Sequence, residues 1–200
     1  MSFWDDRYRG ADYLFGTEPA DFLRRAAPLL APGARVLFLA DGEGRNSTWA
    51  AAQGLRAEAM EPSAPALEKA RVLARAREVE VTLHQAGIED WDWRPETYDA
   101  VAGIFIQFAP PALRDRIHAG IARTLRAGGL VLLHGYAPRQ VGYGTGGPGA
   151  VENLYTLDGL RADFPGWEVL AARDFDAEVA EGAAHRGLSA LVDFVARKPG

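Results

Sequence analysis

Short apolar runs that end abruptly at turn residues recur along this chain, and they limit its possible folds most strongly. Arg35–Leu39 (RVLFL), Tyr98–Phe105 (YDAVAGIF) and Leu130–Leu133 (LVLL) are almost continuously apolar. Strands of this kind are typical of a parallel sheet that is buried on both faces. Segments with helical spacing of apolar residues separate these runs. The alternation of strands and helices therefore predicts an α/β fold.

The remaining elements follow from the same patterns. We predict helices over about 18–30, 46–53, 63–77, from Pro110-Pro111 to Gly128-Gly129, and 156–163, with further strands at 55–60, 79–83, 167–174 and 188–196. The predicted fold is a Rossmann-like, doubly wound, mostly parallel seven-stranded sheet with helices on both faces. The last two strands lack a long intervening helix, which predicts an antiparallel edge strand. We expect a single domain over residues 1–200, made of an N-terminal lid and helix (1–30) and a Rossmann-like core (31–200).

Composition argues against several classes of function. The net charge is −5 and no basic run occurs, so a nucleic-acid partner is not favoured. Cysteine is absent, which excludes disulfides and thiol nucleophiles, and the spacing of the four histidines matches no metal motif. The N-terminus has no apolar signal core and no stretch is long enough to span a membrane, so we expect a cytoplasmic protein without a membrane partner.

A tight turn follows the first predicted strand, in the stretch LFLADGEGRN. Gly42 and Gly44 let the backbone approach a ligand closely, and Glu61 lies about twenty residues further on, where an acid commonly binds ribose hydroxyls. These features predict a ligand that contains a nucleoside. The dinucleotide fingerprint G-x-G-x-x-G is not met, because Ser47 stands at its third glycine.

The stretches LFLADGEGRN, EPS, YDAVAGIFIQF and LRAGGLVLL, in this order and spacing, resemble class I S-adenosylmethionine-dependent methyltransferases. The segments FWDDRY and YLFGTEPADFL resemble the tellurite-resistance (TehB-like) and thiopurine-methyltransferase-like branch, which acts on small molecules. The resemblance covers nearly the whole chain. It implies S-adenosyl-L-methionine as the cofactor and transfer of its methyl group to a small-molecule acceptor by direct displacement.

The same resemblance implies a set of cofactor-binding residues from the N-terminal segment, the glycine turn, the end of the second strand and two later loops. Gly87 departs from the family, which often has an acid at this position. The complete set is Tyr13, Phe15, Gly16, Ala40, Asp41, Gly42, Gly44, Arg45, Asn46, Glu61, Pro62, Ala86, Gly87, Ile88, Ile104 and Phe105.

Two histidines are candidate general bases for an oxygen or nitrogen nucleophile. His134 ends a predicted strand on the ligand side of the sheet, and His185 follows a loop of small residues. Structural roles are the alternative for both. Two other functions stay open: a cofactor-binding or regulatory protein without catalysis, and a nicotinamide-dependent oxidoreductase. The sequence leaves the oligomeric state and the acceptor open.

Overall fold

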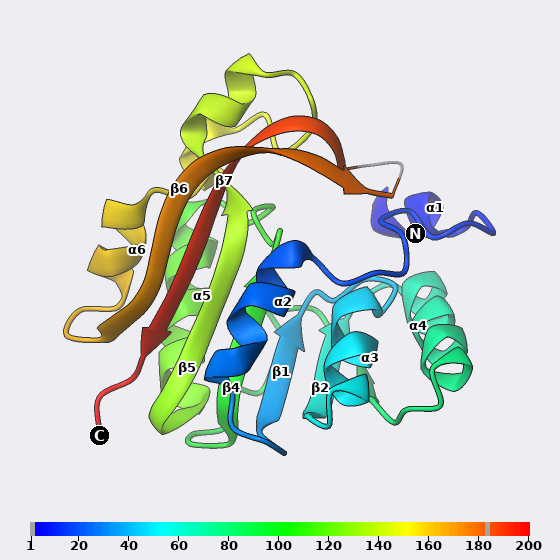
Figure 1. Ribbon diagram of the computed structural model, residues 1–200, viewed down its shortest axis with the longest axis horizontal. Coiled ribbons are helices and arrows are strands. Elements are labelled where there is room, and N and C mark those ends of the chain that lie inside the picture. Colours follow the sequence, from blue (N-terminus) through cyan, green and yellow to red (C-terminus); the bar gives the residue numbers. More distant parts are fainter. Residues whose placement is uncertain (1–2, 183–184) are drawn as a thin grey trace. The chain divides into compact units, whose positions relative to one another are not determined.

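The computed structural model describes residues 3–182 and 185–200. Its strands form a seven-stranded sheet in the order β3-β2-β1-β4-β5-β7-β6 (Figure 1). The pairs β1/β2, β2/β3 and β4/β5 are parallel, whereas β5/β7 is antiparallel. The predicted α/β fold, with a mostly parallel sheet and antiparallel pairing among the last strands, is confirmed.

The chain divides into two compact units, which are described separately below. The first reaches to Trp91 and also includes Glu181 and Gly182, and the second comprises Asp92–Ala180 and His185–Gly200. The division into a lid and a core within one domain stays a prediction, and residues 1 and 2 of the predicted lid lie outside the described residues.

The first unit places a glycine-rich turn at the end of a buried strand. Its elements are α1 (Phe3–Tyr8), α2 (Asp21–Ala26), η1 (Ala27–Leu29), β1 (Arg35–Leu39), α3 (Arg45–Ala52), β2 (Arg56–Glu61), α4 (Ala64–Ala76) and β3 (Thr82–Gln85). The strand β1 has the predicted bounds. Leu39 pairs with Met60 in the parallel register, so β1 and β2 have their carboxyl ends at the same level.

The third strand begins later than the predicted range 79–83. Glu78 has a φ of +54°, and the Val79 amide donates to the Ala74 carbonyl as the chain leaves α4. These residues therefore complete the helix exit, and the strand starts only at Thr82.

The second unit contains the remaining strands and three helical segments beside α5. Its elements are β4 (Tyr98–Ile104), α5 (Pro111–Thr124), β5 (Leu125–Tyr136), η2 (Pro138–Gly142), η3 (Val151–Asn153), α6 (Leu157–Asp163), β6 (Glu168–Glu181, whose last residue belongs to the first unit) and β7 (His185–Arg197). Val131, Leu132 and Leu133 of β5 are fully buried, as their continuous apolar run predicts.

The predicted boundaries at the junction of α5 and β5 are wrong, and β6 runs to Glu181 instead of ending at 174. The helix ends at Thr124 instead of Gly128-Gly129, and β5 starts at Leu125 instead of Leu130. Leu125 already pairs with Tyr98, and the register shifts before the next pair. Gly128, with a φ of +75°, lies in this irregular stretch, and its amide donates to the Lys198 carbonyl. The two glycines thus allow a bulge within the strand.

No helix in the described part of the chain is both long and apolar enough to cross a lipid bilayer.

Candidate functional site

The turn after β1 is formed by three residues with left-handed backbone angles. Ala40, Gly42 and Gly44 have φ values of +45°, +61° and +83°. The Asp41 amide donates to the Met60 carbonyl of β2, so the turn begins directly at the end of the strand pair. Gly44 is the N-cap residue of α3. This geometry brings backbone N–H groups and the start of a helix to the carboxyl end of β1, an arrangement suited to a polar ligand.

Ala40 occupies a position in which a side chain is strained. An L-residue with a Cβ atom pays roughly 1–2 kcal/mol in the left-handed region. We expect Ala40→Gly to raise the free energy of unfolding by about 1 kcal/mol, because relief of strain outweighs the added freedom of the unfolded chain. Denaturant unfolding measures the effect. Ala57→Gly, within β2, is the control and should lower the free energy of unfolding. A loss of stability in both variants would show that the backbone at Ala40 is not strained.

The Glu61 carboxylate connects the turn to the end of β2. It is buried, with 4% of its surface exposed. Its Oε2 accepts a hydrogen bond from the Gly42 amide at 3.0 Å, and its Oε1 accepts one from the Ser63 amide at 2.9 Å. Burial raises the pKa of Glu61, while these two amides oppose the rise. Glu61 therefore positions the glycine turn and places an acid beside it.

Asp41 adds a second acid to the turn. The Ser47 hydroxyl donates to Asp41 Oδ2 at 2.5 Å. Burial, with a further contribution from the Glu61 charge, raises the pKa of Asp41 to about 7 against the opposing Ser47 hydrogen bond. A cationic ligand would favour the ionised form of this carboxyl. The turn thus has the chemistry to bind a positively charged group.

The raised pKa of Asp41 predicts a pH-dependent contribution to stability. Because the folded state holds the proton more tightly than the unfolded state, this contribution is fully present below the ordinary pKa of 3.8 and is lost as the pH rises through about 7. We expect the stability of the wild type relative to Asp41→Asn to fall by up to about 1 kcal/mol per pH unit across this window. Urea unfolding of both proteins between pH 4 and pH 8 measures this difference in stability. A difference that does not change with pH would show that Asp41 does not hold a proton in the folded state.

Tyr8 is a site residue that the sequence analysis missed. A Cβ atom at Gly42 would lie 2.9 Å from the Tyr8 hydroxyl oxygen, so the phenol fills the space that the glycine leaves. Tyr8 is buried and stacks on Trp4, with ring centroids 5.5 Å apart. Burial and the charges of Glu61 and Glu43 raise the pKa of its hydroxyl. Tyr8 is the last residue of the FWDDRY segment. This segment was part of the family resemblance, but none of its residues was assigned to the site.

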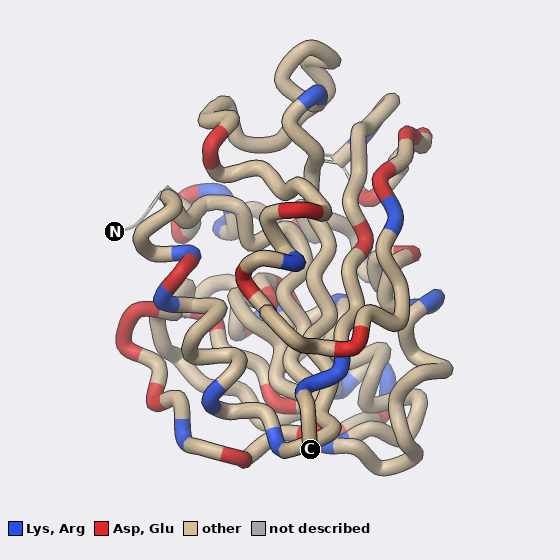
Figure 2. Tube along the Cα trace, turned by 90° about the vertical axis from the view of Figure 1, so that its left-hand side faces the viewer, with Lys and Arg blue, Asp and Glu red and all other residues tan. Residues whose placement is uncertain are grey.

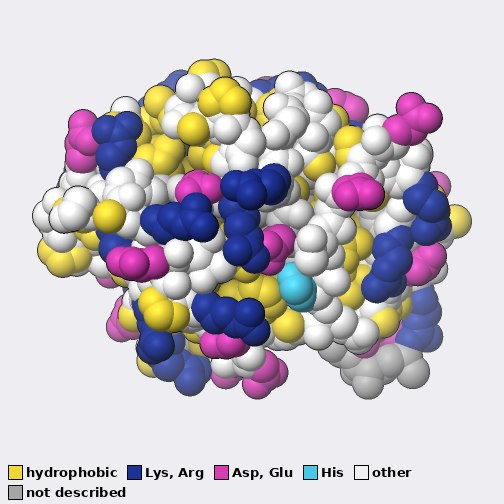
Figure 3. Space-filling view, turned by 90° about the horizontal axis from the view of Figure 1, so that it is seen from below, with side chains coloured by type: hydrophobic (Ala, Val, Ile, Leu, Met, Phe, Trp, Pro, Cys, Tyr) yellow, Lys and Arg dark blue, Asp and Glu magenta, His cyan; other side chains and the backbone are white. Residues whose placement is uncertain are grey.

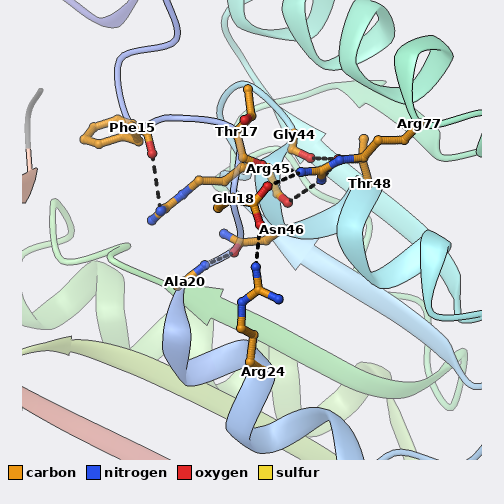
Figure 4. A network of polar contacts seen from close by, with 10 residues as sticks. All are labelled: Phe15, Thr17, Glu18, Ala20, Arg24, Gly44, Arg45, Asn46, Thr48 and Arg77. Atoms are coloured by element: carbon orange, nitrogen blue, oxygen red, sulfur yellow. Dashed lines mark hydrogen bonds and ion pairs between the residues drawn. The ribbon is translucent and has the colours of Figure 1, made fainter. Parts of the chain in front are cut away.

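Residues at the start of α3 hold the N-terminal strap, which we define as residues 9–20. Arg45 donates to the Phe15 carbonyl at 3.4 Å and forms a 2.7 Å ion pair with Glu181, and Asn46 Oδ1 accepts from the Ala20 amide at 3.0 Å. Figure 4 shows both side chains directed toward the strap. From α4, Arg77 donates to the Thr17 carbonyl (Figure 4). Arg45 and Asn46 thus anchor the strap, and their contact with a cofactor stays a prediction.

Glu43, within the turn, anchors the strap from the other side. It is buried, and its carboxylate accepts from the Leu14 amide at 2.8 Å and from Lys69 Nζ at 2.7 Å. The Tyr13 hydroxyl donates to the Lys69 carbonyl at 3.0 Å. Gly16 has a φ of +72° and packs on Gly182, where a Cβ atom would lie 2.5 Å from the Gly16 nitrogen. The strap residues assigned to the cofactor are therefore held tightly over this side of the unit.

The loop after β3 lies beside the end of β2. The Ala86 amide donates to the Glu61 carbonyl at 3.3 Å, and Ile88 is buried. Pro62 is exposed. Gly87 lacks the acid that the family often has, but a Cβ atom there would lie 3.4 Å from Asp90 Oδ2. Asp90 thus brings a carboxylate to this loop from three residues further along the chain.

The other predicted site residues belong to the second unit. Ile104 is the last residue of β4, and Phe105 follows it with a φ of +57°. The Phe105 ring lies 4.7 Å from the His134 ring and 4.3 Å from the His185 ring, measured between centroids. Both candidate bases therefore contact the same aromatic side chain.

Comparison with known proteins finds one family model that matches part of the chain. Residues 36–129 match the family model described as a methyltransferase domain. This segment runs from β1 into β5 and includes the glycine turn and Glu61. No curated protein sequence matches the chain.

Several solved structures share the fold. One, from a study of the conversion of a disulfide bond into a thioacetal group during echinomycin biosynthesis, has a TM-score of 0.80 at 16% identity, with 98% of this chain and 91% of that chain covered. TehB from Haemophilus influenzae has a TM-score of 0.73 at 16% identity, with 98% and 66% covered. The N-methyltransferase NodS from Bradyrhizobium japonicum WM9 has a TM-score of 0.69 at 10% identity, with 89% and 93% covered. At these identities the likeness shows the fold.

Proposed function

We propose that this chain is a class I S-adenosylmethionine-dependent methyltransferase and that it transfers a methyl group to a small-molecule acceptor. The observation that carries the proposal is the turn after β1, where Glu61 binds the Gly42 and Ser63 amides. Backbone donors and buried carboxyl groups meet at this turn, at the carboxyl end of β1 and β2.

The residues of the turn fit the cofactor. S-adenosylmethionine has a sulfonium and an ammonium group, a carboxylate and a ribose diol. Asp41 and Glu61 can balance the positive charges or accept from the diol, and the N–H groups at the start of α3 can donate to the carboxylate. The Tyr8 phenol fills the space beside Gly42 and so places an aromatic ring at the turn.

Each part of the cofactor then has proposed partners in the first unit. The backbone from Ala40 to Gly44 binds the amino-acid end, Glu61 binds ribose, and the loop from Ala86 to Ile88 binds adenine. Asp90 takes the place of the acid that the family has at Gly87. When bound, the cofactor supplies an electrophilic methyl group, so the protein contributes mainly binding, orientation and exclusion of water.

The surface suits a small acceptor better than a nucleic acid. Acidic and basic residues are interspersed along the trace (Figure 2), and the basic side chains on the face in Figure 3 have acidic side chains beside them. The net charge is −5. A phosphate backbone binds best to an extended surface of positive charge, which favours the small molecule as the acceptor.

Calorimetric titration tests the proposed function and separates its two rivals. We expect S-adenosylhomocysteine to bind saturably and NADH not to bind. Formation of S-adenosylhomocysteine from S-adenosylmethionine, with a panel of hydroxyl, amine and thiol acceptors, then tests transfer. Binding of NADH alone would indicate an oxidoreductase. Cofactor binding without transfer to any member of a broad panel would favour a protein that binds the cofactor without catalysis.

A further inference from the structure

Tyr8 of α1 brings a buried hydroxyl group to the glycine turn. The residue is 5% exposed, and a Cβ atom at Gly42 would lie 2.9 Å from its hydroxyl oxygen. Stacking on Trp4 and an edge contact with Phe15, at a centroid distance of 6.4 Å, orient the phenol. These residues and the turn all belong to the first unit. The position of the hydroxyl relative to the turn is therefore set within this unit alone.

The hydroxyl of Tyr8 is oriented but has no partner in the protein. Within residues 3–182 and 185–200, no backbone or side-chain group forms a hydrogen bond with it. The large majority of buried polar side-chain atoms do have a hydrogen-bond partner, because a buried group without one is costly. A hydroxyl of this kind, directed at a turn that is suited to a polar ligand, is placed to bind a group of that ligand.

The backbone donors beside the hydroxyl are already in use. The amides of Asp41, Gly42 and Gly44 all donate to oxygen atoms of the protein, at 3.2, 3.0 and 3.4 Å. What these residues and their neighbours still offer to a ligand are acceptors, namely the carboxyl oxygens of Asp41 and Glu61 and the phenol oxygen of Tyr8. Such a position favours a ligand group that donates hydrogen bonds, and an ammonium group only donates.

The charge around the hydroxyl is negative. Burial raises the pKa of Tyr8, and the charges of three acids, Glu61, Glu43 and Asp41, raise it further. The Arg7 charge lowers this pKa, by less than either glutamate raises it. The phenol is therefore neutral, and its oxygen lies in a potential that attracts a cation. A ligand carboxylate at the same position would be repelled.

We propose that the Tyr8 hydroxyl oxygen accepts a hydrogen bond from the α-ammonium group of the cofactor; this rests on the proposed function, which puts the amino-acid end at the backbone from Ala40 to Gly44. Tyr8 is then a binding residue that selects ligands with an ammonium group. Because S-adenosylmethionine and S-adenosylhomocysteine both have this group, the hydroxyl should contribute equally to the binding of both. An effect through the aromatic ring alone would instead favour the sulfonium cation.

Titration calorimetry of Tyr8→Phe with two ligands provides the test. The ligands are S-adenosylhomocysteine and deamino-S-adenosylhomocysteine, in which a hydrogen atom replaces the ammonium group. The variant keeps the ring and loses only the hydroxyl. We expect it to bind S-adenosylhomocysteine about 10- to 100-fold more weakly than the wild type, since hydrogen bonds to charged groups are among the stronger ones. Its affinity for the deamino ligand should stay within about threefold of the wild-type value, because the bond is then missing in both proteins.

Tyr155→Phe is the matched control. Tyr155 is 3% exposed, belongs to the second unit, and has a hydroxyl that also forms no hydrogen bond with any described residue. This variant should bind both ligands as the wild type does. Urea unfolding should show no loss of stability in either variant, because removing these hydroxyls breaks no hydrogen bond of the protein. A clear loss of stability in Tyr8→Phe alone would show that its hydroxyl has a partner within the protein, which would overturn the proposal.

The binding data decide the rest. Equal losses with the two ligands, or a wild type that binds both equally well, would overturn the assignment of Tyr8 to the ammonium group. These failures are distinct from a failure of the proposed function. A wild type that does not bind S-adenosylhomocysteine defeats the proposed function, whereas a Tyr8→Phe variant that binds it with wild-type affinity defeats only the role of Tyr8.

Discussion

A Glu61→Ala variant is expected to bind S-adenosylhomocysteine roughly 5- to 150-fold more weakly than the wild type, which corresponds to about 1–3 kcal/mol. The loss has two origins. The variant lacks the carboxylate proposed to accept hydrogen bonds from the ribose diol. It also leaves the buried Gly42 and Ser63 amides without their acceptor, so the turn itself is less well ordered.

Two further variants separate these origins. Glu61→Gln preserves the size of the side chain and one acceptor oxygen, and should lose less affinity than Glu61→Ala. Glu80→Gln changes an exposed acid that lies outside the turn and should bind as the wild type does. Titration calorimetry, with circular dichroism to verify folding, makes the comparison. A folded Glu61→Ala protein with unchanged affinity would remove Glu61 from the site.

A Gly44→Ala variant is expected to lose about 2–5 kcal/mol of folding stability. The φ of +83° is unfavourable for alanine and costs about 1–2 kcal/mol. The new Cβ atom would also lie 2.7 Å from Ala70 Cβ and 2.9 Å from Ala70 Cα. Because α3 and α4 pack closely at this point, the clash adds about 1–3 kcal/mol of overpacking.

Gly54→Ala is the matched control for this prediction. Gly54 has nearly the same φ, +81°, but no atom lies within 4 Å of the position that a Cβ would take. The Gly54→Ala variant should therefore lose only the stability that the unfavourable φ costs, about 1–2 kcal/mol. Denaturant unfolding gives both values. Equal losses in the two variants would show that α4 moves away from Gly44 at little cost.

The correct elements in the sequence analysis were those with a strong local signal. The run RVLFL was predicted to be a buried strand at Arg35–Leu39 and has those bounds. The start of β5 was predicted wrongly because a distant partner decides it. Leu125 begins β5 because it pairs with Tyr98, and no pattern near Leu125 contains that information.

The candidate site also contains residues that the sequence predicted and residues that only the structure revealed. The glycine turn and Glu61 follow from spacing, since a strand of known length fixes where the chain must turn and where the next strand ends. Tyr8, Asp90 and Asp193 were not found, because the sequence does not show which residues they contact. Tyr8 lies against Gly42, Asp90 lies beside Gly87, and Asp193 pairs with His134.

The sequence alone therefore determined the α/β class and the position of the glycine turn, because hydrophobic periodicity and backbone freedom are properties of neighbouring residues. Tertiary structure alone decided which side chains anchor the strap and which acid pairs with His134. Asp193 lies 59 positions from His134 along the chain. Only the pairing of β5 with β7 places the two directly opposite each other, since strand register is set by the packing of the whole sheet.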